Sequence, residues 1–131
     1  MTLVVDTSAV VAILMDEPER DRFRNLLLRS SPVISAGSLV EALRISAVRK
    51  ARAISPAWDF LELFSVQVVS LDLAQARLAE EGNRRFGKGR GQPPAVLDFG
   101  DLFAYALARH LDAPLLFKGD GFSRTDLRPA L

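Results

Sequence analysis

The segment of residues 98–120 restricts the fold more than any other part of the chain. It reads DFGDLFAYALARHLDAPLLFKGD, which predicts a helix, a short turn, a strand and then an acidic loop. Because the helix is apolar over most of its circumference, we expect it inside a domain. Its first turn nevertheless carries Asp98 and Asp101, and Asp120 follows the predicted strand at 115–117. Carboxylates are rarely fully buried without a partner, so a buried helix that brings them to one end indicates a functional site.

The amino-acid composition limits the chemistry that such a site can use. The chain has 131 residues, which predicts one domain over residues 1–131. Cys is absent and His110 is the single histidine, which excludes thiolate chemistry and the common zinc enzymes. The net charge of +1 favours no class of partner. No apolar run approaches the roughly 20 residues of a membrane span, and no signal peptide is recognisable, so we expect a cytoplasmic protein without a membrane partner.

Predicted strands and helices alternate along the chain. Short apolar runs predict strands at residues 3–5, 33–35, 66–70 and 115–117. Helical periodicity and capping residues predict further helices at residues 9–15, 19–29, 39–53, 57–64 and 73–86. This alternation predicts an α/β domain with a mostly parallel central sheet. The tail at residues 126–131 could add a short edge strand.

Four acids are predicted at the carboxyl edge of this sheet, which is where α/β proteins bind ligands. Asp6 ends the first strand, and Glu41 lies in the first turn of the helix after the second strand. Asp101 opens the helix before the last strand, and Asp120 follows that strand. Carboxylates that converge within a few ångströms repel one another, so some take up protons or a cation neutralises them. Oxygen ligands without His or Cys select Mg²⁺ or Mn²⁺, which assist the attack of water on a phosphodiester.

Four motifs around these acids resemble those of the PIN-domain ribonucleases, and in particular the VapC-type toxins of bacterial toxin–antitoxin pairs. In chain order they are VVDTSAVVAIL, SLVEA, DFGDLFAYALA and LLFKGDGF, which together cover nearly the whole chain. The resemblance implies a three-layer α/β/α domain whose catalytic residues are Asp6, Glu41, Asp101 and Asp120. It also implies that Asp6, Asp101 and Asp120 bind the metal, and that the hydroxyl of Ser8 supports Asp6.

The sequence departs from the family after Asp120, where relatives often carry a further acid and this chain has Gly121. Asp98 could compensate, because it lies three residues before Asp101 on the same face of the helix. We therefore include Asp98 and Glu41 as additional candidate metal ligands, some of the ligands acting through water.

The resemblance implies a metal-dependent endoribonuclease that cleaves transfer RNA or another structured RNA. It also implies inhibition by a cognate VapB-type antitoxin and assembly into a homodimer. Either interface could use the exposed parts of three apolar residues, Trp58, Leu61 and Phe64. An RNA strand needs a basic rim to approach an acidic pocket. We expect this rim to include Lys88, Arg90 and Lys118.

Each acid also has a structural interpretation. Asp6, Asp98 and Asp120 could be cap or turn residues. Ser38 and Glu41 fit a capping box for a helix that begins at residue 39. Four independent coincidences at strand ends are less plausible than one shared site, so the inference depends on the whole constellation.

Two other functions stay open at this point. One is a non-catalytic PIN-like module that binds a protein partner. The other is a phosphotransfer or phosphatase domain of the same architecture, although Ser8 occupies the position at which a dehalogenase-like phosphatase needs a second Asp. An RNA-stacking platform is not predicted, because Phe99, Phe103 and Tyr105 recur at helical spacing and are interpreted as core residues.

Overall fold

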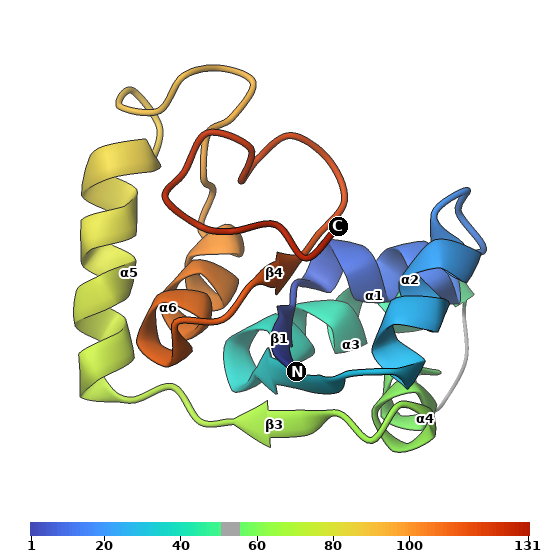
Figure 1. Ribbon diagram of the computed structural model, residues 1–131. Helices are drawn as coiled ribbons and strands as arrows, with labels where there is room; N and C mark the ends of the chain where they lie inside the picture. The colour runs from blue at the N-terminus through green and yellow to red at the C-terminus, as the bar shows by residue number, and fades with distance from the viewer. Residues whose placement is uncertain (51–55) are drawn as a thin grey trace.

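The protein is built on a sheet of parallel strands. The computed structural model describes residues 1–50 and 56–131 (Figure 1). In it β1 (Thr2–Val5) pairs with β2 (Ser31–Ser35) and with β4 (Leu115–Leu116), and β3 (Gln67–Val69) pairs with β2. These pairings are all parallel, and the strand order is β3-β2-β1-β4. The predicted α/β class with a mostly parallel sheet is confirmed.

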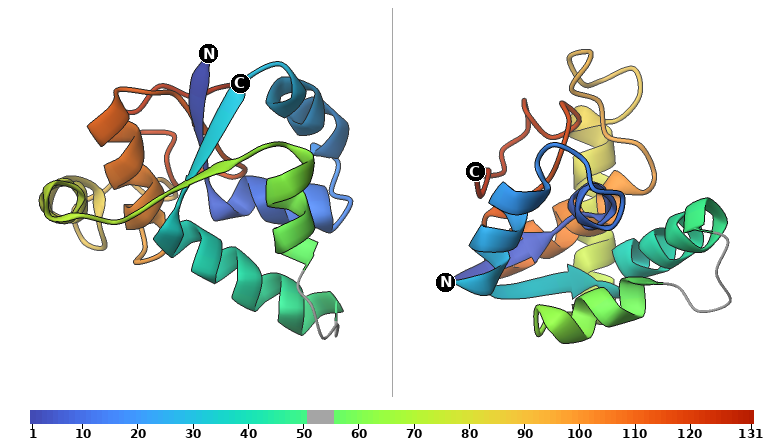
Figure 2. Two further views of the ribbon diagram at one scale, coloured as in Figure 1. Left: turned by 90° about the horizontal axis from the view of Figure 1, so that it is seen from below. Right: turned by 90° about the vertical axis from the view of Figure 1, so that its right-hand side faces the viewer.

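Helices cover both faces of the sheet because its central strand is apolar on both. Leu3, Val4 and Val5 of β1 are all fully buried, and successive side chains point to opposite faces. Leu3 and Val5 join a core formed with four helices, α1 (Thr7–Leu14), α2 (Arg20–Leu28), α3 (Ala36–Lys50) and α4 (Pro56–Leu63). Val4 joins a second core with α6 (Asp101–Leu111), against which α5 (Leu73–Phe86) packs. The result is the predicted three-layer arrangement (Figure 2).

The start of α3 differs from the prediction. The helix begins at Ala36 and not at residue 39, because Ser35 Oγ accepts a hydrogen bond from Gly37 N at 3.2 Å. Ser38 therefore lies inside the helix, where its carbonyl accepts a hydrogen bond from Thr7 Oγ1 at 2.9 Å. The predicted capping box of Ser38 and Glu41 is wrong. The predicted end of this helix, at residues 51–53, lies outside the described residues.

The end of the chain lies beside β4 without forming a regular strand. Leu115 N donates to Arg128 O at 2.9 Å, and Ala130 N donates to Leu115 O at 2.8 Å. These bonds make one isolated parallel bridge between Leu115 and Pro129. The edge strand considered for residues 126–131 is therefore reduced to a single bridge. Within the described ranges, no helix is long and apolar enough to span a membrane.

Tyr105 holds α6 between α5 and the chain's tail. Its side chain is fully buried, and its ring lies so close to Gly82 that a Cβ there would be 2.5 Å from a ring carbon. Its hydroxyl donates to Asp126 Oδ1 at 2.9 Å and accepts from the guanidinium of Arg109 at 2.9 Å. Because the ring lies against Gly82 and its hydroxyl has two hydrogen-bond partners, Tyr105 anchors the helix that begins at Asp101.

We predict that Gly82→Ala destabilises the protein, although alanine is the better helix former by about 1 kcal/mol. The new methyl group would collide with the ring of Tyr105, which cannot move without breaking its hydrogen bonds. Such overpacking costs about 1–3 kcal/mol, so urea unfolding should show a net loss of stability. The exposed residue Glu80 on the same helix provides the control, because Glu80→Ala should change the free energy of unfolding by less than about 0.5 kcal/mol. A stability gain in Gly82→Ala would contradict the packing described here.

Candidate active site

Asp6 is a buried carboxylate at the carboxyl end of β1. Its backbone N–H donates to Leu116 O of β4 at 3.0 Å, so the pairing of the two strands fixes its position. The residue is only 3% exposed, and its Oδ2 accepts hydrogen bonds from Ser8 N at 3.0 Å and from Ser8 Oγ at 2.6 Å. Asp6 therefore caps α1, as its structural interpretation predicts, and its carboxylate is held in one orientation.

Ser8 connects Asp6 to the chain that follows β4. Its hydroxyl donates to Asp6 and accepts from Lys118 N at 3.0 Å. The ammonium group of Lys118 contacts Glu17 at 2.9 Å and Glu19 at 3.3 Å. The Ser8 hydroxyl thus contacts the Asp6 carboxylate, as its predicted supporting role requires. The RNA contact of Lys118 stays a prediction, and it has to compete with these two ion pairs.

Asp101 and Asp98 cap the start of α6 reciprocally. Asp98 Oδ1 accepts from Asp101 N at 2.9 Å, and Asp101 Oδ2 accepts from Asp98 N at 3.0 Å. The exposed side chain of Asp98 is therefore a cap, while Asp101 is partly buried beside the sheet edge. This reciprocal pair holds the carboxylate of Asp101 in position.

Glu41 reaches the same edge because α3 and α6 approach each other closely at two glycines. A Cβ at Gly37 would lie 2.5 Å from the ring of Phe103. A Cβ at Gly100 would lie 2.8 Å from the carboxyl carbon of Glu41. The Glu41 carboxylate thus lies over Gly100, the residue that precedes Asp101, in space that a side chain at position 100 would fill.

The pKa values of Asp6 and Asp101 show that these acids share one electrostatic environment. Burial raises the pKa of Asp6 to about 6, the charge of Glu41 adds to this effect, and the hydrogen bonds from Ser8 oppose it. Burial likewise raises the pKa of Asp101 to about 7, and the charges of Asp6 and Asp98 contribute. Both acids therefore keep their protons to a higher pH than ordinary carboxyl groups do, and a bound cation would favour their ionised forms.

Asp120 joins this group only in part. Its side chain is exposed in the loop after β4, whereas a Cβ on the adjacent Gly121 would lie 3.5 Å from Asp101 Oδ2. Among the described residues, no three His, Cys, Asp or Glu side chains are close enough together to hold a metal ion. The charge of Glu41 acts on Asp6, and the charge of Asp6 acts on Asp101. Asp120 lies on the adjacent loop, so a site shared by all four acids stays a prediction.

Lys88 and Arg90 are exposed on the loop between α5 and α6. This loop is closed by backbone hydrogen bonds, from Leu97 N to Phe86 O at 2.9 Å and from Arg90 N to Gly87 O at 2.9 Å. In the part of the chain that the structure describes, neither basic side chain forms an ion pair. Their predicted contact with RNA stays a prediction.

Phe99 does not lie in the core. This side chain is 76% exposed, so its interpretation as a core residue is wrong, whereas Tyr105 is fully buried. Phe99 lies in the capping turn before the first full turn of α6, where the periodicity of the helix no longer applies. Its ring packs edge-on against Phe103, with 5.2 Å between the centroids. A cavity of about 430 Å³ lies beside these rings and also contacts Glu41.

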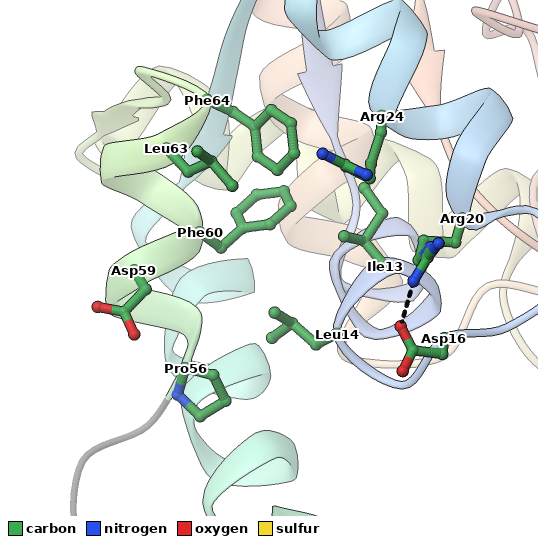
Figure 3. Close-up of a pocket in the computed structure, with 10 residues that line it drawn as sticks. All are labelled: Ile13, Leu14, Asp16, Arg20, Arg24, Pro56, Asp59, Phe60, Leu63 and Phe64. Carbon is green, nitrogen blue, oxygen red and sulfur yellow. Dashed lines mark hydrogen bonds and ion pairs between the residues drawn. The ribbon is translucent and has the colours of Figure 1, made fainter.

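A second, separate groove of about 410 Å³ lies between α1, α2 and α4. Figure 3 shows Phe60 and Leu63 of α4, and Phe64 directly after it, facing Ile13 and Leu14 of α1 across this groove. Arg24 lines it too, as does Arg20, which pairs with Asp16 at 2.9 Å. Leu63 is 65% exposed and Trp58 is 52% exposed. Phe64 is only 5% exposed, so it can contribute to an antitoxin or dimer interface only as part of the groove wall.

Comparisons with known proteins agree with this geometry. The family model described as PIN domain matches residues 3–127. Ribonuclease VapC42 of Mycobacterium tuberculosis is 42% identical over 130 residues, which cover 98% of each chain. Among solved structures, M. tuberculosis VapC20, described as a sarcin–ricin loop cleaving toxin, has a TM-score of 0.75 at 17% identity and 95% coverage of both chains. VapBC2 from Rickettsia felis, bound to a promoter DNA fragment, has a TM-score of 0.72 at 18% identity, with 98% of this chain and 97% of that chain covered.

The chain is an α/β protein whose candidate active site consists of acidic residues at the carboxyl edge of a parallel sheet. Together with the family match, this means that the chain belongs to the PIN domain family and, within it, to the VapC ribonucleases.

We predict that Asp101→Asn stabilises the metal-free protein at alkaline pH. The pKa of Asp101 rises from 3.8 to about 7 on folding, so the folded chain binds this proton more tightly than the unfolded chain does. Stability is therefore lost as the pH rises from about 4 to about 7, and the neutral Asn avoids this loss. In EDTA at pH 8, urea unfolding should show the variant to be more stable by about 1 kcal/mol or more, with little difference at pH 4.

The exposed Asp120 on the neighbouring loop provides the matched control for this measurement. Asp120→Asn should produce no comparable gain at pH 8. If Asp101→Asn were less stable than the wild type at pH 8, the assignment of Asp101 as a buried, destabilising charge would be wrong.

Proposed function

We propose that this VapC-family ribonuclease is a metal-dependent endoribonuclease whose divalent cation is held by Asp6 and Asp101. The observation that carries the proposal is a buried carboxylate, Asp6, beside a partly buried one, Asp101, both with raised pKa values, at the carboxyl edge of a parallel sheet. Folding has placed two charges where each is costly, and a bound cation would offset that cost. The expected cytoplasmic location agrees with an RNA substrate.

The donor set fits Mg²⁺ or Mn²⁺, since it consists of carboxylate oxygens without His or Cys. We assign Asp120 as a third ligand, with Glu41 and Asp98 contributing directly or through water. When bound, the metal would polarise a phosphoryl oxygen and favour attack by water on the phosphodiester bond.

The chain's own residues prepare this site. Ser8 holds the Asp6 carboxylate by two hydrogen bonds, and Asp98 holds the backbone of Asp101. Such preorganisation keeps the acids in position before a substrate arrives. The exposed Lys88 and Arg90 would attract the phosphates of an RNA strand toward the acidic edge. The substrate that we propose is a loop of transfer RNA or of another structured RNA, because loops expose a backbone that can be aligned for attack.

We assign the groove between α1, α2 and α4 to a VapB-type antitoxin. This assignment is supported by the fold shared with VapBC2 and by the chemistry of the groove. Phe60 and Leu63 offer an apolar wall, and Arg24 offers a positive charge, which suits an amphipathic helix with acidic flanks. A homodimer, as expected from the family, stays part of the proposal.

The proposed activity is tested by incubating a total small-RNA pool with the purified protein, in Mg²⁺ or Mn²⁺ and in EDTA. We expect discrete fragments only with metal, and a loss of rate on the order of 100-fold or more in Asp6→Asn and Asp101→Asn. Asp112→Asn provides the control, because this exposed acid lies at the far end of α6 and pairs with Arg128.

Each contrary result has a defined meaning. Intact RNA under every condition, with the antitoxin absent, would leave a non-catalytic protein-binding module as the better account. Cleavage that persists in EDTA or in both Asn variants would show that the acids are not the catalytic groups. Circular dichroism of the variants separates loss of function from loss of fold.

We predict that Leu63→Asp weakens antitoxin binding and leaves RNA cleavage unchanged. Leu63 is 65% exposed and lines a groove to which none of the four acids of the proposed site contributes. A charge in the apolar wall should lower the affinity at least about 10-fold in a titration with the purified antitoxin. Leu28→Asp, at an equally exposed leucine outside this groove, is the matched control. Equal affinities for the two variants would place the antitoxin elsewhere.

A further inference from the structure

Phe99 is an exposed aromatic ring attached directly to the proposed catalytic turn. It is 76% exposed and lies between the capping residue Asp98 and Gly100, over which the Glu41 carboxylate lies. Its ring is oriented by the edge-on contact with Phe103 at 5.2 Å, so one aromatic face is left available. The burial of apolar area does not explain this position, because the ring remains largely in contact with water.

The ring forms one wall of the cavity of about 430 Å³ between α3 and α6. The opposite wall comes from α3, whose residues Val40, Glu41 and Arg44 lie within one turn and share a face. Val40 is 65% exposed, so this wall is apolar and accessible, and Arg44 is exposed and supplies a positive charge. A cavity of this size is within the range that holds a small planar group.

We propose that this cavity binds an unpaired nucleobase of the substrate RNA next to the cleaved phosphodiester, with the base stacked on Phe99. This inference rests on the proposed ribonuclease function and adds a substrate-binding subsite to it. The cavity is continuous with the acidic edge, because Glu41 contacts both and the turn from Asp98 to Asp101 carries both the ring and a catalytic carboxylate. Aromatic rings stack single-stranded bases without requiring a particular sequence.

The position of charge also favours RNA over a protein occupant. Arg44 provides a cation for the phosphate of the nucleotide that follows the stacked base, as arginine commonly does. The groove assigned to the antitoxin is a different one, formed by α1, α2 and α4. Two other occupants of this cavity are conceivable, a second copy of this chain and an antitoxin side chain. Binding of RNA to a Phe99 variant distinguishes them from a nucleobase.

The test uses the full chain carrying Asp101→Asn, so that RNA is bound but not cleaved. The probe is a fluorescently labelled single-stranded RNA of ten nucleotides, together with versions that lack one base at each position in turn. Adding Phe99→Ala should weaken binding of the intact RNA by about 10-fold, and should have no further effect on the one version that lacks the stacked base. Phe99→Trp should retain the affinity, and its fluorescence should be quenched when RNA binds.

Leu28→Ala in the same background provides the control, because Leu28 is 62% exposed and lies on α2, outside the cavity. It should leave RNA binding unchanged. Unchanged binding in Phe99→Ala would overturn the subsite. So would an effect of Phe99→Ala confined to the oligomeric state or to antitoxin affinity, which would assign the ring to a protein interface.

This experiment also separates the two proposals. If the wild type does not cleave RNA with metal but the dependence of binding on Phe99 is observed, the subsite is supported and the catalytic proposal fails. If the wild type cleaves and Phe99→Ala binds and cleaves the same RNA equally well, the catalytic proposal stands and the subsite is overturned.

Discussion

The burial of the Asp6 carboxylate at the carboxyl end of β1 is the constraint on which the rest of the site depends. The parallel pairing of these strands and the bond from Asp6 N to Leu116 O keep the side chain at the carboxyl edge. A buried carboxylate is costly, and the hydrogen bonds from Ser8 offset only part of that cost, since its pKa remains raised. The neighbouring charge of Glu41 increases the cost further. The divalent cation that we propose for this edge would offset that cost.

The second requirement of the site is the close approach of α3 and α6, which brings Glu41 toward Asp101. Glycine makes this approach feasible, because any side chain at position 100 would occupy the space of the Glu41 carboxylate. The same principle acts at the other end of the layer, where Gly82 of α5 accommodates the ring of Tyr105. The position of the acidic edge thus depends on helix packing on one side of the sheet as much as on the strands themselves.

Sequence patterns predicted the features that depend on burial and periodicity. The strands were recognisable because both faces of β1 are apolar, and Asp6 and Asp101 were recognisable because they stand where a strand ends or a helix begins. The two wrong predictions, the capping box of Ser38 and the burial of Phe99, both concern the start of a helix. Ser38 matched a capping pattern, but the helix begins three residues earlier than predicted, where Ser35 Oγ accepts a hydrogen bond from Gly37 N. The exposure of Phe99 depends on where helical periodicity stops, and local sequence does not specify this point.

The acids of the proposed site combine a structural role with the position needed for a functional one. Asp6 accepts hydrogen bonds from the first turn of α1, and Asp101 takes part in a reciprocal cap with Asp98. A capping carboxylate has one oxygen committed to backbone N–H groups, which fixes its rotamer and leaves the other oxygen for a ligand. At Asp6 both hydrogen bonds from Ser8 reach Oδ2. Helix capping is therefore the means by which this fold holds its carboxylates in position, and a capping role is no argument against a role in catalysis.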